Sequence, residues 1–256
     1  MIKFNADKFQ QNLDQLPKFW QKSELNWQIF EKIPSTNQKL WEMIGEGEKT
    51  PIIAIAIQQT AGKGQRGRVW QSQPGGLYLS LGLTTNLPAT NAPHLTLLSA
   101  WGIANSLREN NIPVLIKWPN DIILNRKKLG GILSETRVQF EQITQTVIGV
   151  GINWKNSVPE TGINLQSFPE INSLEKLAAI TIKGLLSGYE YYLSTGIENL
   201  LKSYQQLLDK PIILVNGSPG IVTGITSTGE LQVRLHSLGA TTEINLPPGA
   251  IRIGYC

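Results

Sequence analysis

Residues 113–153 read PVLIKWPNDIILNRKKLGGILSETRVQFEQITQTVIGVGIN, in which four apolar segments of strand length follow one another. Turn-forming residues separate these segments at Pro119-Asn120 and between Asn125 and Lys128. Short runs rich in Ile and Val and bounded by such residues are typical of β-strands. The stretch therefore predicts four consecutive strands, which place a sheet at the centre of the fold.

The segments on either side predict a mixture of strands and helices. Strand patterns occupy 51–59 and 76–83, and the second alternates, with Leu77, Leu79, Leu81 and Leu83 on one face. Helical spacing of apolar residues is predicted for the stretch that begins at Ser35, for 94–110, and, as two helices, for about 172–183 and 185–208.

The pattern changes after Lys210-Pro211, where short β-type segments alternate with Gly-rich turns about every 8 to 12 residues. These segments are IILVNG (212–217), GIVTGIT (220–226), ELQVRL (230–235) and AIRIGY (250–255). They predict a small all-β barrel. We therefore expect two domains, 1–208 and 209–256.

Composition excludes several classes of protein. The 256 residues carry a net charge of +4 with only 16% charged residues, so a phosphate-bearing partner is allowed but not required. The single cysteine, Cys256, excludes a disulfide framework and a cysteine-based metal cluster. The N-terminus lacks a signal-peptide pattern, and no apolar run approaches the roughly 18 residues of a membrane span. These features predict a soluble cytoplasmic protein without a membrane partner.

The most conspicuous motif is QQTAGKGQRGRVW (58–70), which contains the Gly-x-Gly-x-x-Gly spacing of dinucleotide-binding loops. Such a loop needs a helix directly after its third glycine and an acidic residue about 20 positions later. Here a turn and a strand follow Gly67, and no Asp or Glu lies between Glu48 and Glu109. A Walker A loop is excluded as well, because the upstream glycine and the following Ser or Thr are missing.

What remains is a cationic loop after a strand. Lys63, Arg66 and Arg68 have no acidic neighbour in sequence, and the glycines allow backbone N–H groups to approach a ligand. The simpler alternative is a solvated basic turn between two strands.

Three other places offer candidate site residues, each with a structural alternative. Lys117 ends an apolar strand at a turn, where it is either catalytic or an ordinary surface lysine with a buried stem. Alternation puts Gly149, Gly151 and Asn153 on one face of their strand, which clears space for a ligand or for tight packing. Gly130 and Gly131 likewise clear space either for a ligand or for tight packing. Ser35, Thr36 and Asn37 are explained equally well by ligand binding and by helix capping.

Five segments together resemble, in order and wording, the successive signatures of biotin–protein ligases. They are STN (35–37), QTAGKGQRGRVW (59–70), KWPNDI (117–122), KLGGILSE (128–135) and GVGIN (149–153). The resemblance implies an α+β catalytic domain, a mixed sheet with helices related to class II aminoacyl-tRNA synthetases. Residues 209–256 match more weakly the small Src-homology-3-like β-barrel at the C-terminus of that family.

The resemblance also implies an activity and its participants. Biotin would react with Mg·ATP to give biotinyl-5′-AMP and pyrophosphate, and a lysine of the biotin carboxyl carrier protein of acetyl-CoA carboxylase would then receive biotin. Mg²⁺ with ATP is the expected cofactor, and a homodimer is compatible with the family.

Site residues are transferred from the family by position. Lys117 matches the catalytic lysine that stabilises charge at the phosphorus. Biotin would be bound by Ser35, Thr36, Asn37, Gln59, Lys63, Gly64, Gln65, Lys117, Gly131, Gly149 and Gly151. The nucleotide would be bound by Lys63, Arg66, Arg68, Trp70, Asn120 and Asn153, with Asp121 as a metal ligand. A place in the core is the alternative for Trp70, and a turn role explains Asn120 and Asp121 equally well.

One position departs from the family, whose loop usually reads Gly-Arg-Gly-Arg-Arg-Gly-Arg. Here the first arginine is Lys63 and the second is Gln65. A lysine still neutralises phosphate, but a glutamine cannot replace a charged bidentate contact. We therefore expect Arg66, Arg68 and Lys117 to carry more of the adenylate binding, or the adenylate to be held less tightly.

Three other functions can be compared with the sequence: DNA binding by an additional domain, ligation of lipoate or octanoate, and non-catalytic nucleic-acid binding. About 30 residues precede STN, too few for the DNA-binding domain of some family members, so we expect no role in nucleic-acid binding. A lipoate or octanoate ligase would share the fold, but KWPND beside the cationic loop disfavours it. A non-catalytic nucleic-acid-binding module predicts strongly salt-dependent binding and no ATP-dependent pyrophosphate release.

Overall fold

The computed structural model describes residues 4–14, 25–210, 212–215, 218–237 and 240–250. Its helices and strands, in chain order, are α1 (Ala6–Leu13), β1 (Asn26–Ile33), α3 (Thr36–Gly45), β2 (Ile52–Gln59), η1 (Gln65–Gly67), β3 (Gly76–Pro88), η2 (Ala89–Asn91), α4 (Ala92–Glu109), β4 (Leu115–Lys117), β5 (Asp121–Leu124), β6 (Lys127–Gln139), β7 (Gln142–Asn153), α5 (Leu174–Leu207), β8 (Ile212–Val215), β9 (Ser218–Ile225), β10 (Leu231–Ser237) and β11 (Ala240–Leu246).

A seven-stranded mixed sheet forms the centre of the molecule, with strand order β1-β2-β3-β7-β6-β5-β4. Strands β1 and β2 are parallel, and all other neighbours in this sheet are antiparallel. The four strands predicted within 113–153 are β4 to β7, and the predictions for 51–59 and 76–83 correspond to β2 and β3. The predicted series of strands is thus confirmed.

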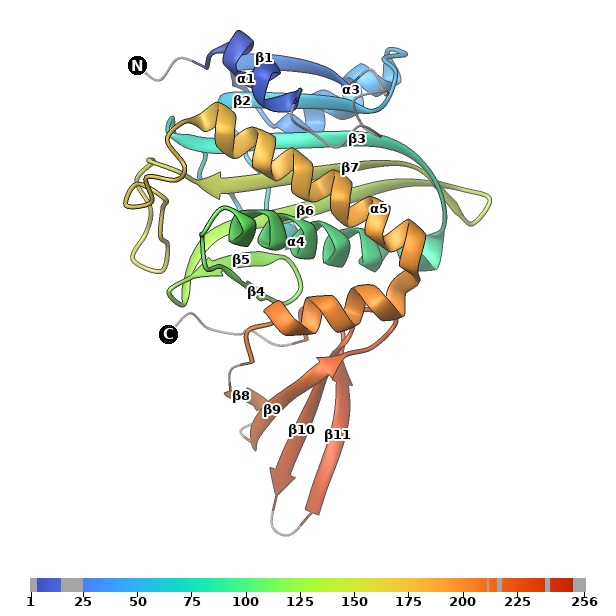
Figure 1. The fold of residues 1–256 in the computed structure, drawn as a ribbon. Coiled ribbons are helices and arrows are strands. Elements are labelled where there is room, and N and C mark those ends of the chain that lie inside the picture. The colour runs from blue at the N-terminus through green and yellow to red at the C-terminus, as the bar shows by residue number, and fades with distance from the viewer. Residues whose placement is uncertain (1–3, 15–24, 211, 216–217, 238–239, 251–256) are drawn as a thin grey trace.

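Helices α4 and α5 cover one face of this sheet (Figure 1). The alternating leucines of β3 are buried in the core on that face together with Val150 and Ile152 of β7, as their alternation predicts. A smaller apolar cluster on the opposite face joins α3 to Ile52, Ala54 and Val147. The remainder of that opposite face is available for a site.

Two helical stretches are present, as predicted for 172–183 and 185–208, but the break between them lies elsewhere. The span of α5 is interrupted by a kink at Gly196, whose φ of 79° and ψ of 177° are not helical. Gly184, where the break was expected, lies inside the helix, because it allows α5 to pack closely on α4. A Cβ there would lie 2.7 Å from the carbonyl oxygen of Gly102.

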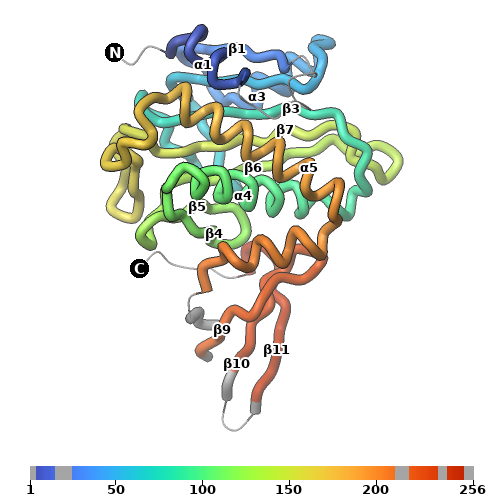
Figure 2. Tube along the Cα trace, in the orientation of Figure 1, coloured from blue at the N-terminus to red at the C-terminus, as the bar shows by residue number. Residues whose placement is uncertain are grey.

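The C-terminal strands form a separate four-stranded antiparallel sheet, in the order β11-β10-β9-β8. Figure 2 shows it projecting from one side of the main sheet, beyond the end of α5. Three of the four predicted segments correspond to β8, β9 and β10, whereas AIRIGY falls almost entirely outside the described residues.

Two strands, β1 and β11, were not predicted. Each has charged or polar residues through its length, as in NWQIFEKI and ATTEINL, because each lies at the edge of a sheet. Among the described helices, none is both long and apolar enough to cross a membrane.

Candidate active site

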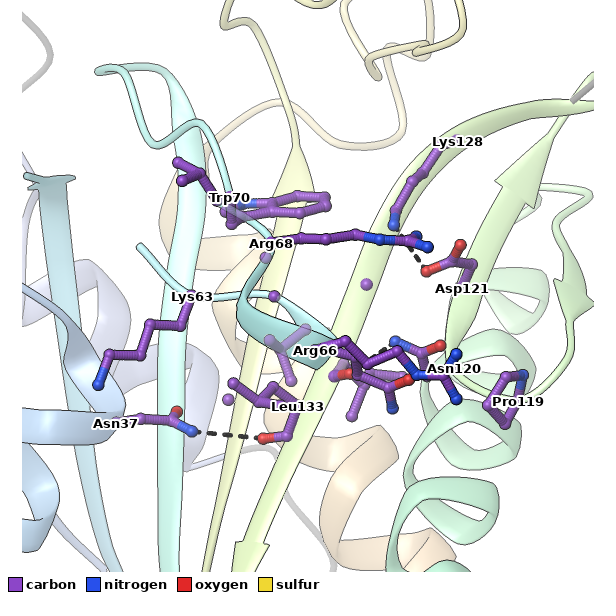
Figure 3. A pocket seen from close by; sticks show the side chains of 18 of the residues that line it. Asn37, Lys63, Arg66, Arg68, Trp70, Pro119, Asn120, Asp121, Lys128 and Leu133 are labelled. Carbon is purple, nitrogen blue, oxygen red and sulfur yellow. Dashed lines mark hydrogen bonds and ion pairs between the residues drawn. The ribbon is translucent and has the colours of Figure 1, made fainter. Parts of the chain in front are cut away.

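A cavity of about 560 Å³ opens on the sheet face opposite α4 and α5. Its walls come from the start of α3, the loop after β2, the turn between β4 and β5, strands β6 and β7, and Gly249 (Figure 3). Of the seventeen residues assigned to the site from the sequence, all but Asn153 line this cavity. Asn153 instead donates hydrogen bonds to the carbonyls of Ile163 (3.2 Å) and Lys128 (3.4 Å).

Three glycines make the floor of the cavity. A Cβ at Gly149 would overlap the Asn37 amide, and one at Gly151 would overlap the indole of Trp70. A Cβ at Gly131 would stand 3.4 Å from each of three side chains, those of Asp121, Lys128 and Trp70. The missing side chains therefore let polar and aromatic groups lie directly on the sheet.

One end of the cavity holds neutral hydrogen-bonding groups. The Gln59 Oε1 accepts from the backbone N–H of Thr36 (2.8 Å) and from its hydroxyl (3.2 Å), and Gln59 Nε2 donates to Ser72 Oγ (2.8 Å). Ser35 occupies the N-cap of α3, but its side chain makes no capping hydrogen bond. Helix capping therefore does not account for the hydroxyl of Ser35.

Asn37, beside Thr36 at this end of the cavity, is held by hydrogen bonds to the protein. Its Oδ1 lies 2.6 Å from Ser80 Oγ, and its Nδ2 donates to Glu135 Oε2 (2.7 Å) and to the Leu133 carbonyl (3.4 Å). Both ends of the amide are thus engaged within the protein. Ser80 and Glu135 were not singled out in the sequence, because a lone Ser or Glu in a strand has no distinguishing pattern.

The glycine-rich loop has a defined conformation of its own. The N–H of Gly64 donates to the Arg68 carbonyl (2.7 Å), and that of Trp70 donates to the Gly62 carbonyl (2.9 Å). Arg66 sits at the tip with a left-handed φ of 60°. The amides of Gly64 and Trp70 are therefore already bonded inside the loop in this conformation, and the approach of the loop's other backbone N–H groups to a ligand stays a prediction.

Positive charge dominates the cavity. Lys63, Arg66, Arg68, Lys117 and Lys128 line it, and Asp121 is the only acidic side chain among the described lining residues. In the view of Figure 3, Arg66 and Arg68 reach toward the turn between β4 and β5, while Lys63 points the other way, toward Asn37. Such a site favours an anion.

Lys117 is buried, with only 6% of its surface exposed, at the end of β4. The turn after it is held from two sides. Tyr204 donates to the Pro119 carbonyl (3.0 Å), and Asn120 Nδ2 donates to the Ile132 carbonyl (2.8 Å). Burial raises the pKa of Tyr204 well above its ordinary value, and the nearby Asp121 carboxylate raises it further, so this phenol stays a donor.

Asp121 is ion-paired with Lys128 at 2.7 Å. Nowhere in the described part of the chain do three or more His, Cys, Asp or Glu side chains gather as they would around a metal ion. Mg²⁺ is usually bound by one or two carboxylates together with substrate phosphates, and not by an all-protein cage. Asp121 as a ligand of Mg²⁺ that enters with ATP therefore stays a prediction.

The C-terminal sheet reaches the cavity at two points. Trp118, next to Lys117, donates its indole N–H to the Gly229 carbonyl (3.0 Å). Arg66 donates to the carbonyl of Pro248, and neighbouring Gly249 lines the cavity. No local sequence pattern predicts these contacts, because they join residues more than 100 positions apart.

Comparisons with known proteins agree with this architecture. The model of the biotin/lipoate A/B protein ligase family matches residues 29–153. The bifunctional ligase/repressor BirA of Salmonella typhimurium is 33% identical over 220 residues, which cover 80% of this chain and 68% of that protein. The chain belongs to the biotin/lipoate A/B protein ligase family.

A second relative in this ligase family matches over a shorter region. BirA of Bacillus subtilis is 38% identical over 141 residues, covering 53% of this chain and 43% of that protein. The matched regions thus span 43% and 68% of the two relatives.

The fold of the ligase family is confirmed by a solved structure. Biotin protein ligase from Aquifex aeolicus, in complex with biotin and ATP, superposes with a TM-score of 0.65 at 22% identity. The superposition covers 86% of this chain and 99% of that one. At this identity the likeness establishes the mixed α+β fold.

Proposed function

We propose that this protein is a biotin–protein ligase that activates biotin with ATP and transfers it to a lysine of a carrier protein. The observation that carries the proposal is the division of one cavity into two ends. Neutral donors and acceptors gather at Ser35, Thr36 and Gln59. Arg66 and Arg68 reach away from them toward the turn that follows Lys117, while Lys63 points toward Asn37 (Figure 3). Biotin offers a neutral ureido ring and a carboxylate, and ATP offers phosphates, so the two substrates complement the two ends.

The reaction has two steps. In the first, a carboxylate oxygen of biotin attacks the α-phosphorus of ATP, an O–P bond forms, and the bond to the β-phosphate breaks to release pyrophosphate. In the second, an uncharged lysine amine of the carrier attacks the acyl carbon of the mixed anhydride, and AMP leaves as an amide forms. The amine loses a proton in this second step.

Lys117 is the proposed catalytic residue. Bringing a carboxylate to a triphosphate gathers negative charge, and a buried ammonium stabilises that charge more strongly than a solvated one would. Its burial at the end of a strand, beside a turn fixed by Tyr204 and Asn120, supports this role because the ammonium is held in a defined position.

We propose that some of the other predicted residues bind biotin and others bind the nucleotide. Biotin's ureido ring would pair with Ser35, Thr36 and Gln59, since leaving its buried polar groups unpaired costs about 1 to 3 kcal/mol each. Arg66, Arg68 and Lys63 would neutralise phosphates, and Trp70 would lie against the nucleotide. The contacts of Asn37 and Asn153 support positioning roles for both residues. Mg²⁺ would enter with ATP, coordinated by its phosphates.

The proposal also covers the domain boundaries, the acceptor protein, the location and the oligomeric state. We infer a catalytic domain at 1–208 and a C-terminal domain at 209–256, whose four-stranded sheet is proposed to be part of a Src-homology-3-like barrel. The end of α5 at Leu207 supports that boundary. We propose the biotin carboxyl carrier protein of acetyl-CoA carboxylase as acceptor and the cytoplasm as location. We also propose a homodimer, which a sedimentation measurement of the protein's mass in solution would test.

The test is to incubate the protein with Mg·ATP, a carrier domain and either biotin or lipoate. We expect pyrophosphate release and a mass increase of the carrier with biotin alone. Labelling with lipoate alone would replace the proposal by a lipoate ligase, and no labelling with either would contradict it. Lys117→Ala should slow adenylate formation by about 100-fold or more, whereas Lys127→Ala, a matched lysine that does not line the cavity, should not. Equal rates would show that Lys117 is not catalytic.

A further inference from the structure

Four polar side chains form a series of hydrogen bonds that leads from outside the cavity to its neutral end. Glu135 Oε2 accepts from Asn37 Nδ2 at 2.7 Å. Asn37 Oδ1 lies 2.6 Å from Ser80 Oγ, which in turn lies 2.7 Å from Thr36 Oγ1. Thr36 and Asn37 line the cavity, whereas Ser80 and Glu135 do not. We call these four residues the Glu135 network.

The fold brings the Glu135 network together from α3, β3 and β6. Alternation along β6 puts Glu135 on the same face as Leu133, which lines the cavity. Ser80 of β3 is paired with Gly149 of β7, whose missing side chain leaves the space that the Asn37 amide fills. Ser80 is fully buried and Asn37 is 4% exposed. A hydrogen bond lost here is therefore not readily replaced by one to water.

Glu135 decides which way the amide of Asn37 faces. A carboxylate accepts hydrogen bonds and has no hydrogen to donate, and the Leu133 carbonyl, 3.4 Å from Asn37 Nδ2 (Figure 3), is an acceptor too. The opposite orientation of the amide would place two acceptors 2.7 Å apart. The NH2 group of Asn37 therefore points to β6, and its oxygen points to Ser80.

The positions of two hydroxyl hydrogens follow from this orientation, because each hydroxyl has only one. Asn37 Oδ1, at 2.6 Å, takes the hydrogen of Ser80. The 2.7 Å contact between the hydroxyls of Ser80 and Thr36 then needs the hydrogen of Thr36, which is shared with Gln59 Oε1 at 3.2 Å. Thr36 thus directs its hydrogen into the protein and presents an acceptor, not a donor, to the cavity.

We propose that Glu135 is a positioning residue that determines specificity, because it acts through Asn37 and Ser80 to make the Thr36 hydroxyl an acceptor for an N–H group of the ligand. The proposal rests on the proposed ligase function, since the ureido ring of biotin supplies two such N–H groups. Lipoate, whose ring carries sulfur atoms and no N–H, would leave the acceptor unpaired.

The first experiment detects the orientation of the Asn37 amide by NMR without a ligand. In the wild type, nuclear Overhauser effects from the Asn37 NH2 protons should be stronger to Glu135 than to Ser80. In Glu135→Lys the new ammonium can only donate, so the amide should turn over and the stronger effects should be to Ser80. An amide that keeps its orientation in Glu135→Lys would overturn the proposal, whatever the protein's substrates.

The second experiment measures dissociation constants for biotin by calorimetric titration. Glu135→Gln, whose amide oxygen still accepts, should stay within about threefold of the wild type, and Glu135→Lys should raise the constant about tenfold or more, because Thr36 then directs a hydrogen at the N–H group. Asn37→Asp in the Glu135→Lys background should restore binding to within about threefold, since a carboxylate at position 37 accepts both from the new ammonium and from Ser80. Glu46→Lys, the same change of charge at the exposed end of α3, should leave biotin binding unchanged.

The double variant separates hydrogen-bond direction from a merely structural role. Binding no better than in Glu135→Lys would overturn the proposal, as would unchanged biotin binding in Glu135→Lys. A biotin analogue with oxygen in place of both ring N–H groups should bind the wild type about tenfold more weakly than biotin, and Glu135→Lys should narrow this difference. An equal difference in both proteins would also overturn the proposal. Failure of the wild type to bind biotin would count against the ligase function, while the orientation result would still stand.

Discussion

Gly149 and Gly151 lie on the same face of β7, but each touches a different side chain. Gly149 faces the Asn37 amide, near the neutral end of the cavity, and Gly151 faces Trp70, near the cationic end. A methyl group at either position would have to displace its neighbour, because the overlap is too close to be absorbed. A methyl group at Gly149 or at Gly151 would therefore disturb a different part of the cavity.

We predict that Gly149→Ala weakens biotin binding by roughly tenfold, because Asn37 must move away from Ser80 and Glu135, to which its amide is bonded. Gly151→Ala should instead weaken ATP binding by a similar factor, because the indole is lifted from the floor. Calorimetric titration of each variant with each ligand checks both. The two variants control for one another, and the same loss for both ligands in both variants would contradict the assignment.

Gln65 is the position where the loop departs from its family, and its side chain lines the cavity without charge. A charged hydrogen bond to phosphate is worth about 1.5 to 3 kcal/mol, so Gln65→Arg should slow release of biotinyl-AMP in the absence of carrier by about tenfold or more. Release is followed by rapid filtration of the preformed adenylate complex. An unchanged release rate would show that Gln65 does not limit adenylate retention.

Most residues of the cavity could be predicted from the sequence because short motifs carry them. Lys128 stands inside the predicted segment KLGGILSE but was not assigned, because an uninterrupted strand would turn it away from Gly131. In the structure, the pairing of β6 with β5 skips Leu129, and this extra residue brings Lys128 to the same face as Gly131. No local sequence pattern reveals such a shift in pairing. Tyr204 was missed for a similar reason, since it contacts Pro119 from a distant helix.

Helices α4 and α5 approach closely because glycines line their contact. A Cβ at Gly184 would lie 2.7 Å from the Gly102 carbonyl oxygen, and one at Gly188 would overlap the carbonyl of Leu98. These glycines explain why sequence reasoning broke α5 in the wrong place. Glycine in a helix is read as a terminus, but here it is required by packing, and the true bend is at Gly196, whose φ is left-handed.

We predict that Gly184→Ala lowers the free energy of unfolding by about 1 to 3 kcal/mol, because the two helices must move apart. Gly45→Ala is the matched control, since Gly45 also lies in a helix but has no atom within 4 Å of where the added methyl group would lie. It should be neutral or stabilising by up to about 1 kcal/mol. Urea unfolding followed by circular dichroism measures both, and equal stability of the two variants would contradict close packing at Gly184.

At the scale of the whole molecule, the C-terminal sheet is attached through the turn between β9 and β10. Gly229 accepts a hydrogen bond from Trp118, and the Ser227 carbonyl accepts one from His94 Nε2 at 2.7 Å. Both donors belong to the larger part of the molecule, and Trp118 adjoins Lys117. The attachment of this sheet is therefore linked to the position of the proposed catalytic lysine.

His94 makes that attachment sensitive to pH. Its Nε2 must carry a hydrogen to donate to the Ser227 carbonyl, and in the neutral ring Nδ1 then accepts from Tyr192 Oη at 2.9 Å. Burial lowers the pKa of His94, and the hydrogen bond to Ser227 opposes this only in part. The unfolded chain, with an ordinary histidine pKa of about 6.5, therefore binds a proton more readily than the folded one.

It follows that His94 contributes stability above pH 6.5 or so, and that this contribution is lost as the pH falls toward the lowered pKa of the folded state. We predict a larger drop in thermal midpoint between pH 7.5 and 5.5 for the wild type than for His94→Gln, whose amide can still donate to Ser227 but does not titrate. The other histidine, His236, is common to both proteins, so its effect cancels. Equal drops would show that His94 is not a source of acid sensitivity. A larger drop in the wild type, accompanied by loss of adenylate formation at low pH that His94→Gln relieves, would show that release of the C-terminal turn reaches Lys117 through Trp118.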